Sequence, residues 1–251
     1  MQITWNGTGS AWSTYYGNSS ALLETSGHRL VMDCGYTVPG RLRQMGVGVQ
    51  NIDAIFISHL HGDHIFGLEE IGFRAKFSEG CRVNLIVPEP LVERLWHNIL
   101  SGTMREPEDR CNLRDYFDVQ IIREGEVLQQ GPWSLEIHAV DHMPHAPCYG
   151  VKIGANGKAV AFTADTKAGI APFFYEGTEY VFHDCSFLPY FPETIHTHFE
   201  QLLDYTPEQR AKTWLVHYDD ETHQRLASVE WRTIVEESGM RITESFIPII
   251  V

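Results

Sequence analysis

One stretch of six residues, His59-Leu60-His61-Gly62-Asp63-His64, places three imidazoles and a carboxylate close together in the chain. The apolar run Ile52–Ile57 before it is typical of a buried strand, and Ile65–Ile71 after it is typical of the start of a helix. A strand-to-helix turn of this kind presents several side chains to one point. Neutral imidazole and carboxylate are ligands of Zn²⁺ and of other divalent transition ions. The stretch therefore predicts a metal site on an α/β fold.

Length and charge limit the classes of function. The chain has 251 residues, 43% of them hydrophobic, which is enough for a full core. Its 33 acidic and 19 basic residues give a net charge of −14, which disfavours a surface built to hold nucleic acid. A small anionic substrate remains compatible, because bound metal ions can reverse the local sign of charge.

Cysteine usage and the absence of targeting signals indicate the compartment. The five cysteines are scattered, with no Cys-x-x-Cys pair, which favours reduced intracellular thiols. The first residues lack the basic and apolar segments of a signal peptide, and no run of about 18 apolar residues is present. We therefore expect a cytoplasmic protein without a membrane span.

Strands and helices alternate in two successive halves, which predicts one domain over residues 1–251 with two sheets flanked by helices. The expected strands are Gln2–Trp5, Ala21–Glu24, Arg29–Asp33, Ala54–Ser58, Arg82–Val87, Val119–Ile122, Leu135–Val140, Tyr149–Ile153, Ala159–Thr163, Tyr180–His183, Trp214–His217 and Ser245–Val251. The expected helices are Leu42–Met45, Phe66–Phe77, Phe199–Tyr205 and His223–Glu237, and Ser101–Asp115 is expected to be an irregular surface excursion.

Three polar residues follow apolar strands later in the chain. His142 closes a strand in which Leu135, Ile137 and Ala139 alternate with polar residues, and His145 is the alternative for the same role. The two others are Asp165, after Ala159–Thr163, and His217, after Trp214–Val216. Each is weak alone. Their occurrence after a His-x-His-x-Asp-His turn predicts that they complete one metal site.

This set of residues resembles the metallo-β-lactamase superfamily, and the resemblance covers nearly the whole chain. It implies an α/β fold, the metallo-β-lactamase-like αββα sandwich, and two divalent metal ions, zinc or alternatively manganese. Carried over, the first metal would be held by His59, His61 and His142. The second would be held by Asp63, His64 and His217, and Asp165 would bridge the two.

Further motifs are similar to those of the ribonuclease Z-like branch. Gly7-Thr8-Gly9 and Pro147-Cys148-Tyr149-Gly150 fit this branch. Phe182–Phe187 resembles its His-Glu-x-x-Phe element, with Asp184 in place of Glu, and Ile195-His196-Thr197 resembles its His-Ser-Thr element. The resemblance implies that His196, with Asp184 as its partner, assists the leaving group, and it makes Asp63 a catalytic residue as well as a ligand. His198 is the competing candidate for the role of His196.

Thr197-His198-Phe199-Glu200 also has the spacing of a capping box, which would place His196 just before a helix.

One departure from ribonuclease Z narrows the function. That enzyme has a long arm that grips transfer RNA, whereas the turn Gly154–Lys158 in this chain is too short for one. The chain is most similar to the arm-less cyclic nucleotide phosphodiesterases of the branch, which include the viral anti-Pycsar proteins. The resemblance implies a homodimer in a bacterium or infected host cell. It implies hydrolysis of 3′,5′-cyclic nucleotides to nucleoside 5′-monophosphates.

Two other classes of function stay open. One is a ribonuclease Z-like endonuclease for RNA 3′ ends, or another metallo-hydrolase. The other is a catalytically dead nucleotide-binding protein. Aromatic residues in expected loops could stack on a base, or could be core or dimer contacts; they are Tyr15, Tyr16, Phe187, Tyr190 and Phe191.

Overall fold

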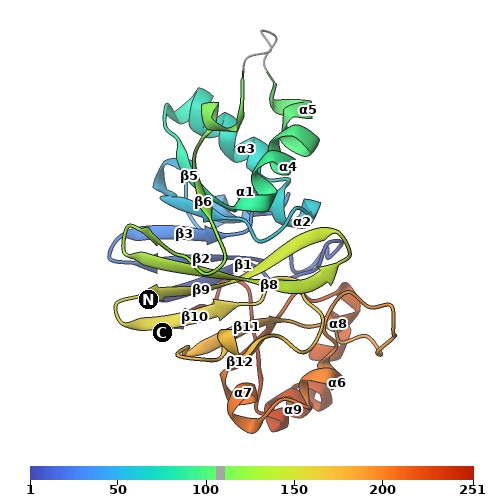
Figure 1. The fold of residues 1–251 in the computed structure, drawn as a ribbon. Helices are drawn as coiled ribbons and strands as arrows, with labels where there is room; N and C mark the ends of the chain where they lie inside the picture. The colour runs from blue at the N-terminus through green and yellow to red at the C-terminus, as the bar shows by residue number, and fades with distance from the viewer. Residues whose placement is uncertain (106–110) are drawn as a thin grey trace.

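Two seven-stranded β-sheets lie face to face between two layers of helices (Figure 1). The computed structural model describes residues 1–105 and 111–251. In Figure 1 the helices α1, α3, α4 and α5 cover one sheet from above, and α6, α7 and α9 cover the other from below. The order of layers is αββα, which confirms the fold class predicted from the sequence.

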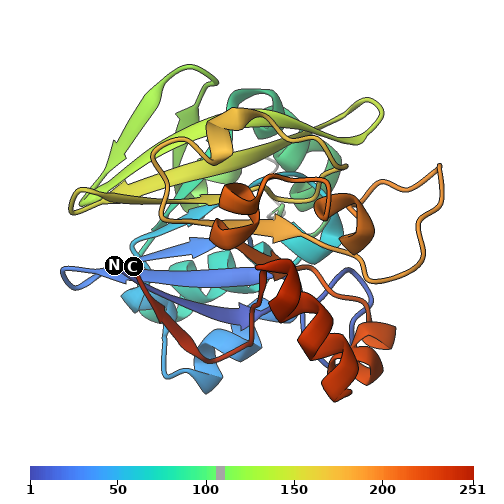
Figure 2. The same cartoon turned by 90° about the horizontal axis from the view of Figure 1, so that it is seen from below.

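The first sheet is antiparallel at one end and parallel at the other. Its strand order is β14 (Pro248–Ile250), β1 (Gln2–Gly7), β2 (Ser20–Thr25), β3 (His28–Met32), β4 (Ala54–Phe56), β5 (Val83–Pro88) and β6 (Phe117–Ile122). β1, β2 and β3 pair antiparallel, while β3, β4, β5 and β6 pair parallel. Pairing of β1 with β14 brings the two ends of the chain together (Figure 2).

The second sheet repeats this plan. Its order is β13 (Arg241–Ile242), β12 (Thr213–Val216), β11 (Tyr180–Asp184), β10 (Lys158–Phe162), β9 (Ala146–Ala155), β8 (Trp133–Met143) and β7 (Val127–Gln130). β7 to β10 pair antiparallel, and β10 to β13 pair parallel. Parallel strands need crossover connections, and these carry most of the helices.

The helices pack through separate apolar clusters on the two outer faces. Above the first sheet are α1 (Val38–Gln44), α2 (Gly62–Ile65), α3 (Leu68–Phe73), α4 (Val92–Arg94) and α5 (Ser101–Met104), with π-helical turns at Arg74–Glu79 and Leu95–Leu100. Beneath the second sheet are α6 (Phe199–Leu202), α7 (Pro207–Lys212), α8 (Asp220–Leu226) and α9 (Val229–Ser238). Short 3₁₀ turns occur at Val49–Asn51, Glu89–Leu91, Leu113–Asp115 and Pro172–Phe174.

An aromatic group in the core between the sheets anchors two strands that lead to the polar centre. Trp5 on β1 lies 5.8 Å from Phe162 and 5.4 Å from Phe182, measured between ring centroids, and these two rings stack at 5.0 Å. Phe162 ends β10 just before Asp165, and Phe182 lies two residues before Asp184. Such aromatic pairs contribute about 0.5–1.5 kcal/mol each beyond their buried area.

Several boundaries differ from the sequence prediction. The short edge strands β7 and β13 were not predicted. The single helix predicted over His223–Glu237 is two helices, because Ser228 caps the start of α9. The excursion predicted at Ser101–Asp115 begins with α5, and residues 106–110 of it lie outside the described residues.

The connection between β9 and β10 is a two-residue hairpin turn. Asn156 and Gly157 both have positive φ, 54° and 76°, as the tight turns favoured between antiparallel strands require. The short turn predicted at Gly154–Lys158 is therefore confirmed. No helix in the described part of the chain is long and apolar enough to cross a membrane.

Gly35 lies where the chain leaving β3 meets the His-x-His-x-Asp-His turn. The Cys34 amide donates to the His64 carbonyl at 2.7 Å, and the Gly67 amide donates to the Cys34 carbonyl at 2.8 Å. A Cβ on Gly35 would stand 1.9 Å from the Asp63 carbonyl oxygen. Only glycine fits this contact without a shift of the backbone.

We expect Gly35→Ala to lower the free energy of unfolding by about 1–3 kcal/mol, the usual cost of overpacking a tight contact. Urea unfolding measures it. Gly102→Ala in α5 is the matched control, since nothing lies within 4 Å of a Cβ there, and it should leave stability equal or slightly higher. Equal stability of the two variants would contradict the contact.

Candidate metal centre

The polar centre lies where strands of both sheets end. β4 of the first sheet ends at Phe56, shortly before His59. In the second sheet, Asp165 follows β10, Asp184 ends β11 and His217 follows β12. Ligands of α/β proteins bind outside the carboxyl ends of parallel strands, because side chains from neighbouring strands meet there.

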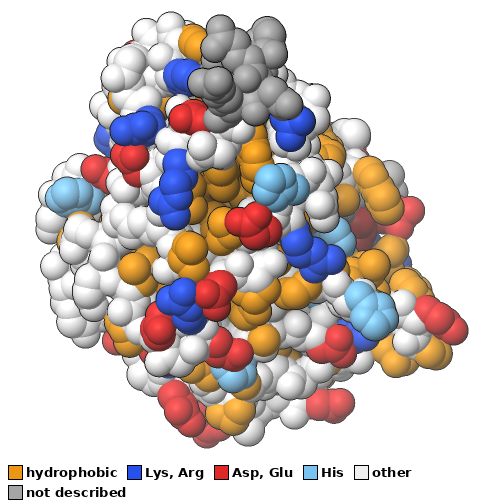
Figure 3. Space-filling view, turned by 45° about the horizontal axis from the view of Figure 1, so that its top comes forward, with side chains coloured by type: hydrophobic (Ala, Val, Ile, Leu, Met, Phe, Trp, Pro, Cys, Tyr) orange, Lys and Arg blue, Asp and Glu red, His pale blue; other side chains and the backbone are white. Residues whose placement is uncertain are grey.

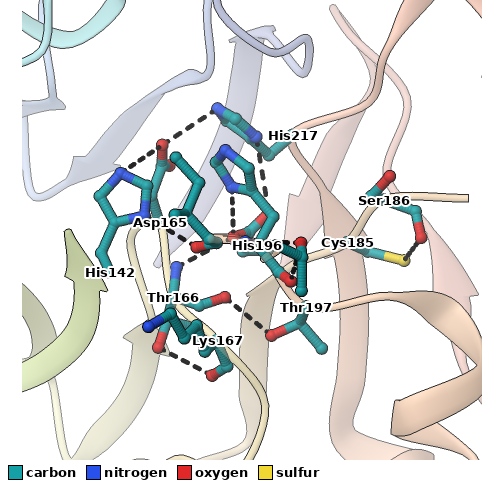
Figure 4. A network of polar contacts seen from close by, with 12 residues as sticks. His142, Asp165, Thr166, Lys167, Cys185, Ser186, His196, Thr197 and His217 are labelled. Carbon is teal, nitrogen blue, oxygen red and sulfur yellow. Dashed lines mark hydrogen bonds and ion pairs between the residues drawn. The ribbon is translucent and has the colours of Figure 1, made fainter. Parts of the chain in front are cut away.

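Three overlapping groups of histidine and aspartate could hold metal ions. In each, the potential ligand atoms lie within 4.8 Å of one another. Asp165 belongs to all three, and Figure 4 shows His142, His196 and His217 turned toward it. The groups are His59, His61, His142 and Asp165; Asp63, His64, Asp165 and His217; and Asp165, Asp184, His196 and His217.

The first group matches the set predicted for one metal, with Asp165 at its edge. Nε2 of His59 and Nε2 of His142 lie 3.7 and 3.8 Å from the same Asp165 oxygen, Oδ2. Nε2 of His142 lies 3.2 Å from Nδ1 of His61. Three imidazole nitrogens and one carboxylate oxygen thus face a common point.

The second group lies on the other side of Asp165. Nε2 of His64 is 3.4 Å from Asp165 Oδ1 and 3.2 Å from Asp63 Oδ2. Nε2 of His217 is 3.3 Å from Asp165 Oδ2 and 3.6 Å from Asp63 Oδ2. The structure brings the seven candidate ligands close together, and Asp165 belongs to both groups.

The chemistry of these atoms fits metal ions. Among the described residues, Nε2 of His59, His64 and His217 is buried and finds no hydrogen-bond partner of acceptable geometry. Buried nitrogens without a partner are costly, and several aimed at the same carboxylates are the arrangement of a ligand set.

The opposite ring nitrogens are held by the protein. Nδ1 of His64 lies 2.8 Å from Asp33 Oδ2, and Nδ1 of His142 lies 2.9 Å from the Ile195 carbonyl. Nδ1 of His59 lies 3.0 Å from Ser58 Oγ, which donates to Asp33 Oδ2 at 2.7 Å. Partners of this kind fix the tautomer and direct Nε2 to the metal.

The sequence analysis did not identify Asp33 and Ser58 as functional residues. The Asp33 carboxylate holds His64 directly and His59 through Ser58, so it orients one residue of each group. The available signal was its position at the end of the strand predicted over Arg29–Asp33, the same position that identified Asp165.

Three non-glycine residues around the centre have left-handed backbone conformations. The φ angles are 55° for Asp33, 55° for Ala164 and 72° for His217. Such conformations cost on the order of 1–3 kcal/mol each and persist where surrounding structure imposes them. The strain lies at the strand ends that direct side chains to the centre.

Electrostatics divide the histidines into two kinds. Burial lowers the pKa of His59, His61 and His142, so these rings are neutral and can offer a lone pair. Burial opposes charge on His64 and His217 as well, but Asp165 and its neighbours raise the pKa of both. Protons on these two rings neutralise the carboxylates that a divalent cation would otherwise neutralise, so proton and metal compete.

A β-bulge decides which histidine of the β8–β9 hairpin joins the centre. Pairing shifts by one residue between Val140 and Met143, and a shift of one reverses the face on which later side chains lie. His142 is thereby buried in the first group, although it is out of phase with the buried residues Leu135 and Ile137 earlier in β8. His145, the alternative, is exposed in the turn.

His196 and Asp184 form a pair at the edge of the centre. Nδ1 of His196 lies 2.8 Å from Asp184 Oδ2, and Nδ1 of His217 lies 3.5 Å from Asp184 Oδ1. Burial opposes charge on His196, but Asp184 raises its pKa above the usual value, and His196 helps hold the pKa of Asp184 at about 2. The His196 side chain is 27% exposed, so it can reach a ligand.

His198, the alternative, points elsewhere. Its Nδ1 lies 2.7 Å from the Leu188 carbonyl and its Nε2 lies 2.9 Å from Thr194 Oγ1. The helix-cap prediction was wrong by one residue: His198, with Gln201, caps α6. The Thr197 hydroxyl donates instead to the Thr166 carbonyl.

The aromatic residues considered for base stacking separate into two groups. Phe187 is buried and stacks on Phe199, and partly buried Tyr16 packs edge-on to Tyr218 at 5.4 Å between centroids, so both belong to the core. Tyr15 is exposed and stacks on His223 at 4.4 Å. Tyr190 and Phe191 are exposed on the loop before His196.

Comparison with known proteins gives a consistent result. The sequence profile of the family described as "Anti-Pycsar protein Apyc1" matches residues 1–240. Anti-Pycsar protein Apyc1 of Bacillus phage 010DV004 is 36% identical over 233 residues, covering 88% of this chain and 90% of that protein. The protein of the same name from Saccharibacillus brassicae is 34% identical over 231 residues, covering 89% and 92%.

Solved structures agree on the fold. The metallo-β-lactamase fold protein YhfI from Bacillus subtilis has a TM-score of 0.79 at 16% identity, covering 99% of this chain and 98% of its own. The short form of human tRNase Z has a TM-score of 0.72 at 19% identity, covering 100% and 99%. Unliganded yeast PDE1 has a TM-score of 0.73 at 14% identity, covering 100% and 99%.

We expect Asp33→Ala to weaken metal binding by about 10- to 100-fold, because His64 and Ser58 lose the carboxylate that orients them. Titration against a competing chelator measures it. Asp53→Ala is the matched control. Asp53 lies just before β4, at the strand end far from the centre, and accepts a hydrogen bond from the Arg29 amide. Unchanged metal affinity in Asp33→Ala would show that Asp33 does not orient the ligands.

Proposed function

The chain belongs to the anti-Pycsar Apyc1 family, and on this premise we propose that it is a dinuclear metal-dependent phosphodiesterase. It hydrolyses 3′,5′-cyclic nucleotides to nucleoside 5′-monophosphates and so silences a cyclic nucleotide antiviral signal. The observation that carries the proposal is the position of Asp165 between two ligand groups, beside the His196–Asp184 pair. This combines a two-metal arrangement with a proton donor.

The ligand assignment follows the two groups. His59, His61 and His142 would hold one ion, Asp63, His64 and His217 would hold the other, and Asp165, which belongs to both groups, would serve both. When bound, two divalent ions activate water as the nucleophile and neutralise charge on the phosphate. Zinc suits this mixture of imidazole and carboxylate, with manganese as the alternative.

The protein's own residues position the substrate and move the proton. Asp184 accepts from Nδ1 of His196, which leaves Nε2 of the same ring to face the substrate. The raised pKa favours the charged ring, which can give a proton. Water attacks phosphorus, the bond from phosphorus to the 3′ oxygen breaks, and His196 protonates that oxygen, a contribution of about 10²–10⁴-fold.

Processing of RNA ends is the alternative hydrolase function, and two features disfavour it. The β9–β10 connection is the two-residue turn Asn156-Gly157, with no room for a gripping arm. On the face shown in Figure 3, acidic and basic side chains are interspersed, and the net charge is −14. Phosphate backbones favour surfaces where positive charge dominates.

We expect about two transition ions per chain by elemental analysis of the purified protein. Asp165→Ala should reduce the content of both, because it removes a carboxylate that faces both groups. His61→Ala is the comparison variant, since His61 belongs to the first group alone and should spare one ion. One tightly held ion, unchanged in Asp165→Ala, would contradict the bridge.

We expect the protein to hydrolyse 3′,5′-cyclic mononucleotides with loose base preference. A panel of cyclic mononucleotides, cyclic dinucleotides and a transfer RNA precursor, analysed by chromatography, measures this. Efficient cleavage of the precursor with intact cyclic nucleotides would favour the RNA alternative. Binding of cyclic nucleotides without turnover by the metal-loaded protein would identify a dead binding protein.

We expect His196→Ala to keep its metal and to lose kcat and kcat/KM in parallel, the pattern for an interaction made only in the transition state. A nitrophenyl phosphodiester has a good leaving group that needs little protonation, so its turnover should fall much less. Steady-state kinetics on both substrates measures the difference.

His198→Ala and His217→Ala are the controls for His196. His198 points away from the centre, so His198→Ala should not produce the selective loss of cyclic nucleotide turnover that is expected for His196→Ala. His217→Ala should lose metal and fail on both. Equal damage to both substrates by His196→Ala, with metal retained, would exclude His196 as the general acid.

A further inference from the structure

A pocket of about 180 Å³ opens beside the first ligand group. His59, Leu60 and His61 line one side of it. The helical segment that starts with α4 contributes Arg94 and Asn98 to the lining, and β9 contributes Pro147. A substrate phosphate at the metal centre would therefore have this space as its neighbour.

The lining combines apolar walls with hydrogen-bonding groups. Leu60, Ile99 and Pro147 offer flat apolar surface. Arg94 and Asn98 are four residues apart, the spacing that places two side chains on one face of a helix, and both are exposed. Such a mixture, mostly apolar with a few polar groups, is typical of pockets for small organic ligands.

Arg94 also holds the wall of the pocket in place. Its two terminal nitrogens donate to the His145 carbonyl in the β8–β9 turn, at 3.3 and 3.4 Å. A guanidinium has five N–H donors, so this contact uses only part of them. The same side chain can steady the hairpin and donate to an acceptor on a ligand.

We propose that this pocket binds the nucleobase of the nucleotide substrate, with Arg94 and Asn98 as its hydrogen-bonding residues. The proposal rests on the phosphodiesterase function and names the subsite that distinguishes a nucleotide from a bare phosphate ester. Arg94 donates to base carbonyl or ring-nitrogen acceptors. The Asn98 amide both donates and accepts, so it suits the polar edge of more than one base.

Two exposed aromatic residues on the loop before His196 are the competing location for the base. Tyr190 and Phe191 lie edge-on to the ring of His198, at 5.6 and 5.4 Å between centroids. They are on the loop that leads to His196, and neither lines the pocket. The two locations predict different sensitive residues, which makes them separable.

Calorimetric binding to the metal-loaded protein tests the pocket, with cytidine 5′-monophosphate and inorganic phosphate as the two probes. The nucleotide should bind more tightly than phosphate. Arg94→Ala should weaken the nucleotide about tenfold and Asn98→Ala about three- to tenfold, the usual effects of a charged and a neutral hydrogen bond. Phosphate affinity and metal content should not change.

Arg82→Ala is the matched control. It removes the same side chain from the start of β5, where Arg82 pairs with Asp118 at 3.0 Å, at the opposite strand end from the centre. It should leave both affinities unchanged. Loss of Arg94 could also weaken binding by shifting the β8–β9 hairpin that it contacts at His145. Asn98→Ala tests the pocket without removing that contact.

The outcomes separate the pocket from the phosphodiesterase activity. Nucleotide binding no tighter than phosphate, or unchanged in both pocket variants, overturns the pocket. Loss of nucleotide binding in Tyr190→Ala or Phe191→Ala alone also overturns it and moves the base to that loop. Binding that depends on Arg94 without hydrolysis of any cyclic nucleotide retains the pocket and rejects the phosphodiesterase function.

Discussion

Burial of four carboxylates between two sheets is the constraint on which the centre depends. Asp33, Asp63, Asp165 and Asp184 are all buried. Removing a charge from water costs several kcal/mol unless an opposite charge and hydrogen bonds compensate. Six imidazoles surround these carboxylates, and protons on His64 and His217 or divalent cations supply the positive charge. The candidate ligands, the residues that orient them and the strained strand ends together place positive charge beside the buried carboxylates.

The sequence predicted the parts of the site whose signal is local. The His59–His64 turn is recognisable because four potential ligands and their flanking strand and helix are contiguous. Asp165 and His217 follow because each ends an apolar strand. The alternation of predicted strands and helices along the chain indicates two sheets flanked by helices, and the structure confirms this fold class.

The rest depends on contacts that no local pattern contains. The position of Asp33 at a strand end can be read from the sequence, but its contacts with His64 and Ser58 depend on the pairing of β3 with β4. The bulge that turns His142 inward depends on the partner strand β9. The edge strands β7 and β13 are too short to give a periodic signal.

The sequence alone also could not decide between His196 and His198 as the proposed proton donor. Both have the right residue type and lie two positions apart. Tertiary contacts separate them: His196 pairs with Asp184, while both ring nitrogens of His198 contact Leu188 and Thr194. The distinction matters because a proton donor must have one nitrogen directed at the substrate.

The division of the ligands between the sheets has a mechanical consequence. The turn after β4 belongs to the first sheet, whereas His142, Asp165 and His217 belong to the second. An ion bound at either group would therefore cross-link the layers, and because its ligands come together only in the folded chain, its binding free energy would stabilise the fold. The two ligand groups would thus both position ions for catalysis and join the two sheets where their strands end.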